Sequence, residues 1–125
     1  MARVAAGEYF SSAERLTIDN AIRRAEQSCR FEFSVYVGPV EGDYPRAFAE
    51  RLHQRLVAPA RSILVMVDPA RRVLEVVTGE DVRRRVTDAE TELAVLAMQT
   101  ELAGCSLCSG IVRGVDQLAA HAHRG

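Results

Sequence analysis

The stretch Ser62–Gly79 constrains the fold of this 125-residue chain more than any other part of it. Its first half holds an unbroken apolar run, Ile63–Val67, which is typical of a strand buried on both faces. The next segment, Asp68–Arg72, predicts a turn, because proline fixes φ and the two arginines favour water. Apolar residues resume at Val73 and stop at Gly79. The stretch therefore predicts a β-hairpin at the centre of the fold.

Amphipathic helices are predicted before the hairpin. Ser11 and Glu14 have the spacing of a capping box, and the helix that they open is expected to end near Cys29. We interpret Cys29 as a small core side chain. A second helix begins near Pro45. Within it, His53 has charged and polar sequence neighbours, so we predict that this histidine faces solvent.

Two further helices are predicted after the hairpin. Thr87 and Glu90 form a second capping box, and the helix that follows is apolar around so much of its circumference that we expect burial on more than one side. The last helix carries a regular apolar stripe. Gly110 and Gly114 lie one turn apart in it, and they are predicted to let another backbone approach closely.

The direction of each strand follows from its connections. The β-rich segment 31–37 reaches the hairpin through a crossover helix, so it is predicted to be parallel to Ser62–Val67 and the second hairpin strand antiparallel. The fold class is therefore α/β, a small mixed sheet of about three to four strands with helices on both faces, in the order α-β-α-β-β-α-α. We expect one domain over residues 10–123, after a short lead-in over residues 1–9.

The composition excludes some classes of function. Sixteen basic and seventeen acidic side chains give a net charge of −1, which offers no electrostatic case for nucleic acid. No run approaches the roughly 20 apolar residues of a transmembrane helix, and no signal peptide is recognised. Three cysteines in such a chain indicate reduced thiols. We therefore expect a cytoplasmic protein without an integral membrane segment.

Three carboxylates are predicted at one edge of the sheet, namely Glu41, Asp43 and Asp68. Calcium takes six to eight oxygen ligands, and these side chains with backbone carbonyls supply part of such a set. The competing interpretation is that turns and helix caps are rich in acidic residues whatever their function. The spacing does not match an EF-hand. No cofactor is required by the sequence, and calcium is the ion that these residues favour.

Cys105 and Cys108 form a C-x-x-C pair that suggests a redox site. Zinc is excluded, because one continuous helix places Cys108 about 20 Å from His121. The competing interpretation is structural: Ser106 caps the last helix, and both cysteines fill space.

A run of three arginines, Arg83, Arg84 and Arg85, follows the hairpin. The acidic pair Glu80–Asp81 adjoins the run and partly neutralises it. A solvated face is the default interpretation. The functional alternative is a contact with an anion or an acidic partner.

The order of elements resembles the TPM-domain family, which includes thylakoid-lumen phosphatase-like proteins and bacterial relatives. The resemblance is carried by Phe10-Ser11, by ILVMVDPARRVLEVVTG in the hairpin, by Val86-Thr87-Asp88, and by the two glycines of the last helix. More closely, EFSVYVG, LVMVDP, EVVTGEDVRRRV and GIVRGVDQLAAH resemble an actinobacterial domain family of unknown function. That closer likeness runs from about residue 10 to 123, and it implies the same α/β fold.

The resemblance also implies candidate functions, since some TPM domains are linked to calcium binding and acid phosphatase activity through clustered aspartates. Among the family's acidic positions Asp88 is retained, which makes it the candidate catalytic residue and a fourth candidate calcium ligand. Ser106 stands where the family carries an aspartate. Our leading hypothesis is a non-catalytic TPM-like module that binds an unidentified protein. The alternatives are a weak metal-dependent phosphatase built on Asp88 and the three carboxylates, and a thiol redox sensor built on the cysteine pair.

Overall fold

The computed structural model describes residues 9–103 and 106–124. The order of helices and strands is the predicted α-β-α-β-β-α-α. Short 3₁₀ turns at Pro59–Arg61 and Val82–Arg84 precede the hairpin and follow it. The elements are α1 (Ser12–Cys29), β1 (Glu32–Val37), α2 (Pro45–Gln54), β2 (Ser62–Asp68), β3 (Val73–Thr78), α3 (Asp88–Ala103) and α4 (Leu107–Arg124).

The described part of the chain forms one three-stranded sheet in the order β1-β2-β3. The strands β1 and β2 are parallel, with Glu32 opposite Ser62 and Val37 opposite Val67. The strands β2 and β3 are antiparallel, with Ile63 opposite Thr78. Both predicted directions are confirmed. Every residue of β2 is buried, as the apolar run of the central strand predicted.

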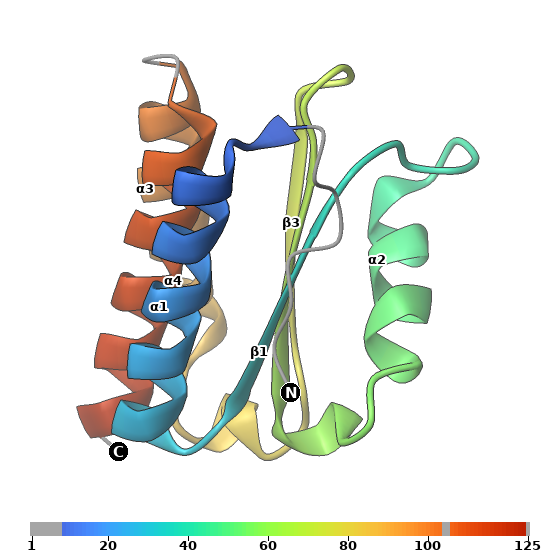
Figure 1. The fold of residues 1–125 in the computed structure, drawn as a ribbon. Coiled ribbons are helices and arrows are strands. Elements are labelled where there is room, and N and C mark those ends of the chain that lie inside the picture. Colours follow the sequence, from blue (N-terminus) through green and yellow to red (C-terminus); the bar gives the residue numbers. More distant parts are fainter. Residues whose placement is uncertain (1–8, 104–105, 125) are drawn as a thin grey trace.

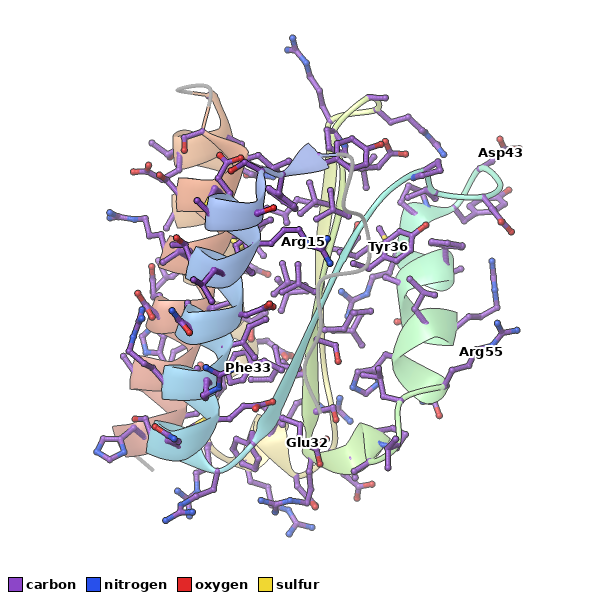
Figure 2. All side chains as sticks on the ribbon, in the orientation of Figure 1. Arg15, Glu32, Phe33, Tyr36, Asp43 and Arg55 are labelled. Carbon is purple, nitrogen blue, oxygen red and sulfur yellow. The ribbon has the colours of Figure 1, made fainter. Side chains whose placement is uncertain are left out.

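Helices cover both faces of the sheet, and the two layers differ in size (Figure 1). The helices α1, α3 and α4 pack on one face, and α2 lies on the other. Side chains alternate along β1, so that Phe33 belongs to the core beneath the three helices and Tyr36 packs in the smaller core beneath α2. Figure 2 shows these two residues on opposite faces of the sheet.

Both predicted capping boxes are present. Ahead of α1, Ser11 Oγ accepts a hydrogen bond from the Glu14 amide at 3.1 Å, and the Ser11 amide donates to Glu14 Oε1 at 2.9 Å. Ahead of α3, Thr87 Oγ1 accepts from the Glu90 amide at 3.1 Å, and the Thr87 amide donates to Glu90 Oε1 at 3.0 Å. The sequence therefore marks the start of both helices.

The start of α4 and its contact with α3 also agree with the predictions. The Ser109 amide donates to Ser106 Oγ at 3.2 Å, so Ser106 caps the helix. A Cβ atom on Gly110 would lie 3.4 Å from the Met98 carbonyl oxygen, and one on Gly114 would lie 2.1 Å from Met98 Sδ. The two glycines therefore allow α3 and α4 to pack closely.

Gly79 fixes the end of β3. A Cβ atom there would lie 2.1 Å from the carbonyl oxygen of Pro59 and 2.4 Å from that of Ala60. The Gly79 amide donates to the Ser62 carbonyl at 2.9 Å, which continues the pairing of the hairpin. The strand thus ends against the backbone of the turn that leads into β2.

The prediction that His53 faces solvent is wrong. This residue is only 4% exposed, and its Nε2 donates to the Ser62 carbonyl at 2.9 Å. The prediction relied on the polar residues next to His53 in the sequence. On a helix, however, His53 shares a face with Ala49, one turn earlier, and that face packs on the sheet.

The prediction that α3 is buried on more than one side is also wrong. Among its residues Ala94 and Met98 are buried, on the side that faces α4 and the sheet. Leu93 and Leu96 are 53% and 58% exposed. The described part of the chain has no further helix to cover them. The outward-facing side of α3 is therefore apolar and exposed.

None of the helices described by the structure is long and apolar enough to cross a membrane.

Candidate functional site

The strand β3 forms one edge of the sheet, and its backbone groups alternate in direction. The Gly79 amide bonds to Ser62 in β2, so the odd-numbered residues of β3 direct their amide and carbonyl groups toward β2. The groups of Leu74, Val76 and Thr78 consequently point away from the sheet. They form a row of donors and acceptors along its outer edge.

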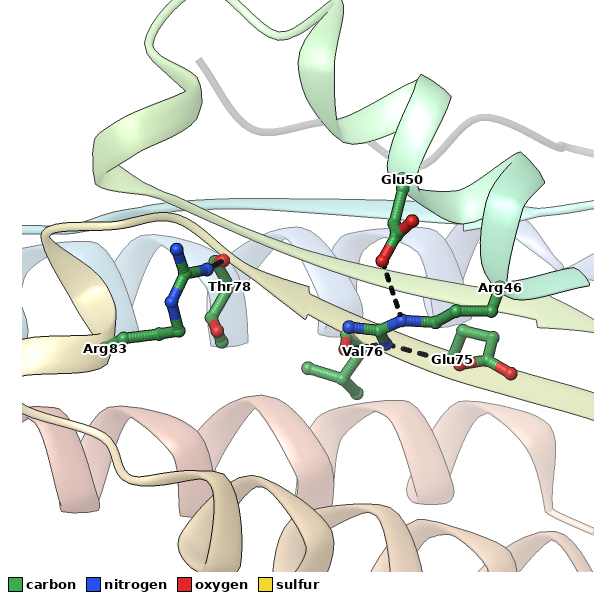
Figure 3. Close-up of polar contacts among 6 residues, drawn as sticks. All are labelled: Arg46, Glu50, Glu75, Val76, Thr78 and Arg83. Atoms are coloured by element: carbon green, nitrogen blue, oxygen red, sulfur yellow. Dashed lines mark hydrogen bonds and ion pairs between the residues drawn. The ribbon is translucent and has the colours of Figure 1, made fainter.

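Two arginines bond to this outer edge, as Figure 3 shows. Arg46 Nη1 donates to the Val76 carbonyl at 2.7 Å, and Arg83 Nη1 donates to the Thr78 carbonyl. Arg46 also pairs with Glu75 Oε1 and with Glu50 Oε2, each at 3.3 Å. Guanidinium groups therefore donate hydrogen bonds to two carbonyls of β3 that would otherwise be available to a neighbouring strand.

Local structure explains how both arginines reach the strand. Arg46 follows Pro45 in the first turn of α2, four residues before Glu50, so the ion pair between them lies along the helix. Arg83 belongs to the 3₁₀ turn after β3, and its amide donates to the Gly79 carbonyl at 3.1 Å. That turn brings the Arg83 side chain back along the strand it has just left.

A hollow lies between β3 and α2, with a volume of about 1030 Å³. Arginines outnumber glutamates in its lining, and the Arg51 guanidinium also lies 5.9 Å from the centre of the Phe48 ring. The buried His53 contributes to it as well. Positive charge therefore dominates the α2 side of the edge. The charged lining residues are Arg46, Glu50, Arg51, Arg55, Glu80 and Arg83.

A second hollow, of about 550 Å³, lies between β3 and α3. Leu74, Val95 and Leu96 give it apolar walls. Its acidic side chains from α3 are Asp88 and Glu92. Arg46 and Thr78 line both hollows, so the two meet along the outer edge of β3. We call this surface, the edge of β3 with its two flanking hollows, the β3 edge.

The predicted carboxylates at the turn end of the sheet have different surroundings. Asp68 is 1% exposed, and its two oxygens accept from the Val40 amide at 2.9 Å and the Arg71 amide at 3.2 Å. Asp68 thus ties the hairpin turn to the loop after β1. Glu41 and Asp43 are exposed, and Figure 2 shows Asp43 on the loop before α2.

Asp88 lies elsewhere, in the first turn of α3 beside the β3 edge. Within residues 9–103 and 106–124, no three His, Cys, Asp or Glu side chains form a group that could hold a metal ion. The candidate ligands Glu41, Asp43, Asp68 and Asp88 are therefore not brought together in such a group. Calcium binding stays a prediction, as does a catalytic role for Asp88.

The three arginines of the run have different surroundings. Arg83 bonds to β3, Arg84 lies 4.0 Å from Asp81, and Arg85 is exposed. The contact between Arg84 and Asp81 agrees with the expected partial neutralisation. Arg83 is the member of the run that the fold places at the candidate site.

Of the two cysteines in the predicted redox pair, Cys105 lies outside the described residues. Cys108 is half-buried, with its Sγ 3.8 Å from the Glu14 carbonyl oxygen. Burial, together with the Glu14 carboxylate, raises the pKa of the Cys108 thiol. Burial also raises the pKa of Cys29, which lies in the core as predicted. A redox role for the cysteine pair stays a prediction.

Sequence analysis missed Arg46, Leu93 and Leu96. Two signals were available: the spacing of Arg46 and Glu50 on the helix that covers a small sheet, and the excess of apolar residues on α3. Neither signal indicates an edge strand by itself. The outer position of β3 emerges only when all the strands have been paired.

Solved structures with the same fold include two from bacteria. The NMR structure of the BA42 protein from Bizionia argentinensis matches with a TM-score of 0.86 at 17% identity, over 94% of this chain and 84% of that one. The N-terminal domain of the cg2496 protein from Corynebacterium glutamicum matches with a TM-score of 0.78 at 18% identity, over 94% and 76%. At these identities the similarity shows the fold alone.

The curated relatives include uncharacterized proteins from two strains of Mycobacterium tuberculosis, CDC 1551 and H37Rv. Each is 26% identical over 111 residues, which cover 89% of this chain and 66% of the relative. The chain therefore spans about two thirds of the length of these relatives. The model of a domain of unknown function matches residues 2–119. The protein therefore belongs to the DUF5130 family, whose function is unknown.

Proposed function

We propose that this domain acts by binding another protein, as a non-catalytic TPM-like module, and that the β3 edge with the outer side of α3 is its contact surface. The observation that carries the proposal is the exposure of Leu93 and Leu96, at 53% and 58%, on α3, where Leu96 lines the hollow beside the edge strand β3. Exposed apolar side chains next to an edge strand are features that protein-binding surfaces share.

Other large apolar side chains are exposed, but they are scattered. Leu16 lies on α1, Tyr44 precedes α2, and Val57 lies in the loop after α2. Single exposed residues of this kind are ordinary on a protein surface. Leu93 and Leu96 differ because they lie one turn apart on one helix, and Leu96 also lines the hollow beside β3.

A photo-crosslinking experiment tests the proposal. A photoreactive amino acid is placed at Leu93 or Leu96 in the full chain and, as a matched control, at Val57, which is 94% exposed on another part of the surface. In its native cells the protein is expected to form one discrete adduct from Leu93 and Leu96, and none from Val57. Unlabelled wild-type protein should compete for that adduct, and the double variant L93E/L96E should not. Equal labelling from all three positions would contradict the proposal.

The enzymatic alternative needs its own measurement. Turnover of p-nitrophenyl phosphate is compared between the wild type, Asp88→Asn and Glu92→Gln, since both residues line the same hollow. We expect no turnover that persists through purification. Activity that persists and disappears in Asp88→Asn, but not in Glu92→Gln, would overturn the non-catalytic part of the proposal.

A further inference from the structure

We propose that the β3 edge accepts an added strand, an extended partner segment in which acidic side chains alternate with apolar ones. The segment would match the six residues of β3 in length. This inference rests on the proposed function, since it states how the same surface holds its partner. Strand addition is a common mode of peptide recognition, in which the backbone supplies affinity and alternate side chains supply specificity.

The outer edge of β3 presents backbone groups to an added strand. The amide and carbonyl groups of Leu74, Val76 and Thr78 point outward, in the arrangement that a neighbouring strand requires. Two of their carbonyls are bonded to Arg46 and Arg83. Both arginines are exposed, and the Arg46 side chain is 53% accessible. An incoming strand can therefore displace the two guanidinium groups without moving any element of the fold.

The two hollows beside β3 differ in charge. Successive side chains of an added strand point to opposite faces, so one set enters the hollow beside α2 and the other the hollow beside α3. The α2 side is dominated by arginine, which favours acidic residues in the partner. The α3 side has apolar walls with Asp88 and Glu92, which favour apolar residues and disfavour acidic ones. Alternation of acidic and apolar residues follows.

The arginines also explain why the occupant is a partner rather than a second copy of this chain. When the edge is empty, Arg46 and Arg83 cap its carbonyls. When an acidic segment is bound, the released guanidinium groups would pair with its carboxylates. A second β3 edge would instead bring its own Arg46 and Arg83 toward the same place, and like charges oppose that pairing.

A titration with synthetic peptides tests the inference. The probe is a fluorescein-labelled peptide that alternates glutamate with leucine over the length of β3. One control replaces glutamate with lysine, and another carries N-methyl groups on the amides that would face β3. We expect the probe to shift the amide resonances of Leu74, Val76 and Thr78, and either control to bind at least about tenfold more weakly in fluorescence anisotropy. The double variant R46E/R83E should lose affinity, and R23E, on exposed α1 surface, should retain it.

The outcomes separate this inference from the proposed function. Equal binding by the N-methylated peptide would show contact through side chains alone and overturn strand addition. Equal binding by the lysine peptide would overturn the acidic character of the partner. If Leu96 crosslinks to a partner but the probe does not bind at millimolar concentration, strand addition fails and the proposed function stands. Concentration-dependent self-association with the same amide shifts would identify a second copy as the occupant and overturn the choice of partner.

Discussion

The two edges of the sheet are capped in opposite ways. At the β1 edge the Phe33 amide donates to Glu26 Oε2 at 3.0 Å, so a carboxylate from α1 satisfies a donor. At the β3 edge guanidinium groups satisfy acceptors. Glu26 is half-buried, whereas Arg46 and Arg83 are exposed, although α1 packs against β1 and α2 packs against β3 in the same way. The β1 cap is thus a half-buried side chain, and the β3 caps are exposed side chains.

This contrast matters because an open strand edge invites pairing with another chain. Both edges carry charged caps on some of their outward-facing groups, namely the Phe33 amide on β1 and the Val76 and Thr78 carbonyls on β3. The β3 edge has a hollow on each side, whereas β1 lines a hollow of about 330 Å³ on the side of α2 within the described part of the chain. We infer that the half-buried cap of β1 is structural and that the exposed caps of β3 are reversible contacts.

The largest effect is expected at Gly79, which holds the end of β3. In Gly79→Ala the new Cβ would meet the Pro59 and Ala60 carbonyl oxygens, which belong to the backbone and cannot rotate away. We expect the free energy of unfolding to fall by about 3 kcal/mol in urea titrations followed by circular dichroism. Gly114→Ala is the control, because its new methyl meets the flexible Met98 side chain, and it should cost about 1 kcal/mol. Equal losses would contradict backbone contact as the cause.

The next effect concerns Asp68, which joins the two edge strands through the loop after β1 and the turn before β3. Asp68→Ala leaves the Val40 and Arg71 amides without their partner, in a site that is 1% exposed. We expect a loss of about 2 kcal/mol of stability, since bonds to a charged acceptor are strong and a buried orphan donor is costly. Asp43→Ala removes an exposed carboxylate from the neighbouring loop and should have almost no effect. A similar loss in both variants would contradict a specific role for Asp68.

A direct comparison of the two edges gives a smaller effect. Glu26→Ala leaves the Phe33 amide unsatisfied in a half-buried place and is expected to cost about 1 kcal/mol. Arg46→Ala removes two ion pairs of an exposed side chain and a part-buried bond to the Val76 carbonyl, and it should cost about 0.5 kcal/mol. Both are measured by urea unfolding at low and high salt. If Arg46→Ala were the more costly change, the β3 cap would be structural and its displacement by a strand would be disfavoured.

Much of this architecture could be predicted from the sequence, because its signals are local. The apolar run in Ile63–Val67, the two capping boxes and the chain connections determine the helices, the hairpin and the strand directions. Gly79 was predicted to end its strand, although the backbone that it touches was not. These features depend on a residue and its near neighbours along the chain.

The β3 edge could not be predicted in the same way, because it depends on which surfaces remain uncovered after packing. Arg46 bonds to a strand 30 residues away, and Leu93 is exposed because no described helix covers it. His53 was misplaced because its neighbours in sequence differ from its neighbours in space. The candidate calcium ligands Glu41, Asp43 and Asp68 were linked through topology alone, which places residues at an end of the sheet but does not orient their side chains.

The smallest effect concerns the reactivity of thiols, which measures how well the core next to β1 is protected from solvent. Cys29 is the last residue of α1, shortly before β1 begins. Burial raises the pKa of both Cys29 and Cys108. A raised pKa means less thiolate at a given pH, so both should react with iodoacetamide only at higher pH than a small free thiol, with Cys29 the slower. In a Cys105→Ser background, Glu14→Gln keeps the capping-box geometry but removes a negative charge near Cys108, so its pKa should fall and its rate at fixed pH should rise. Rapid alkylation of Cys29 would show that the β1 side opens as readily as the β3 edge, and the contrast between the two edges would be lost.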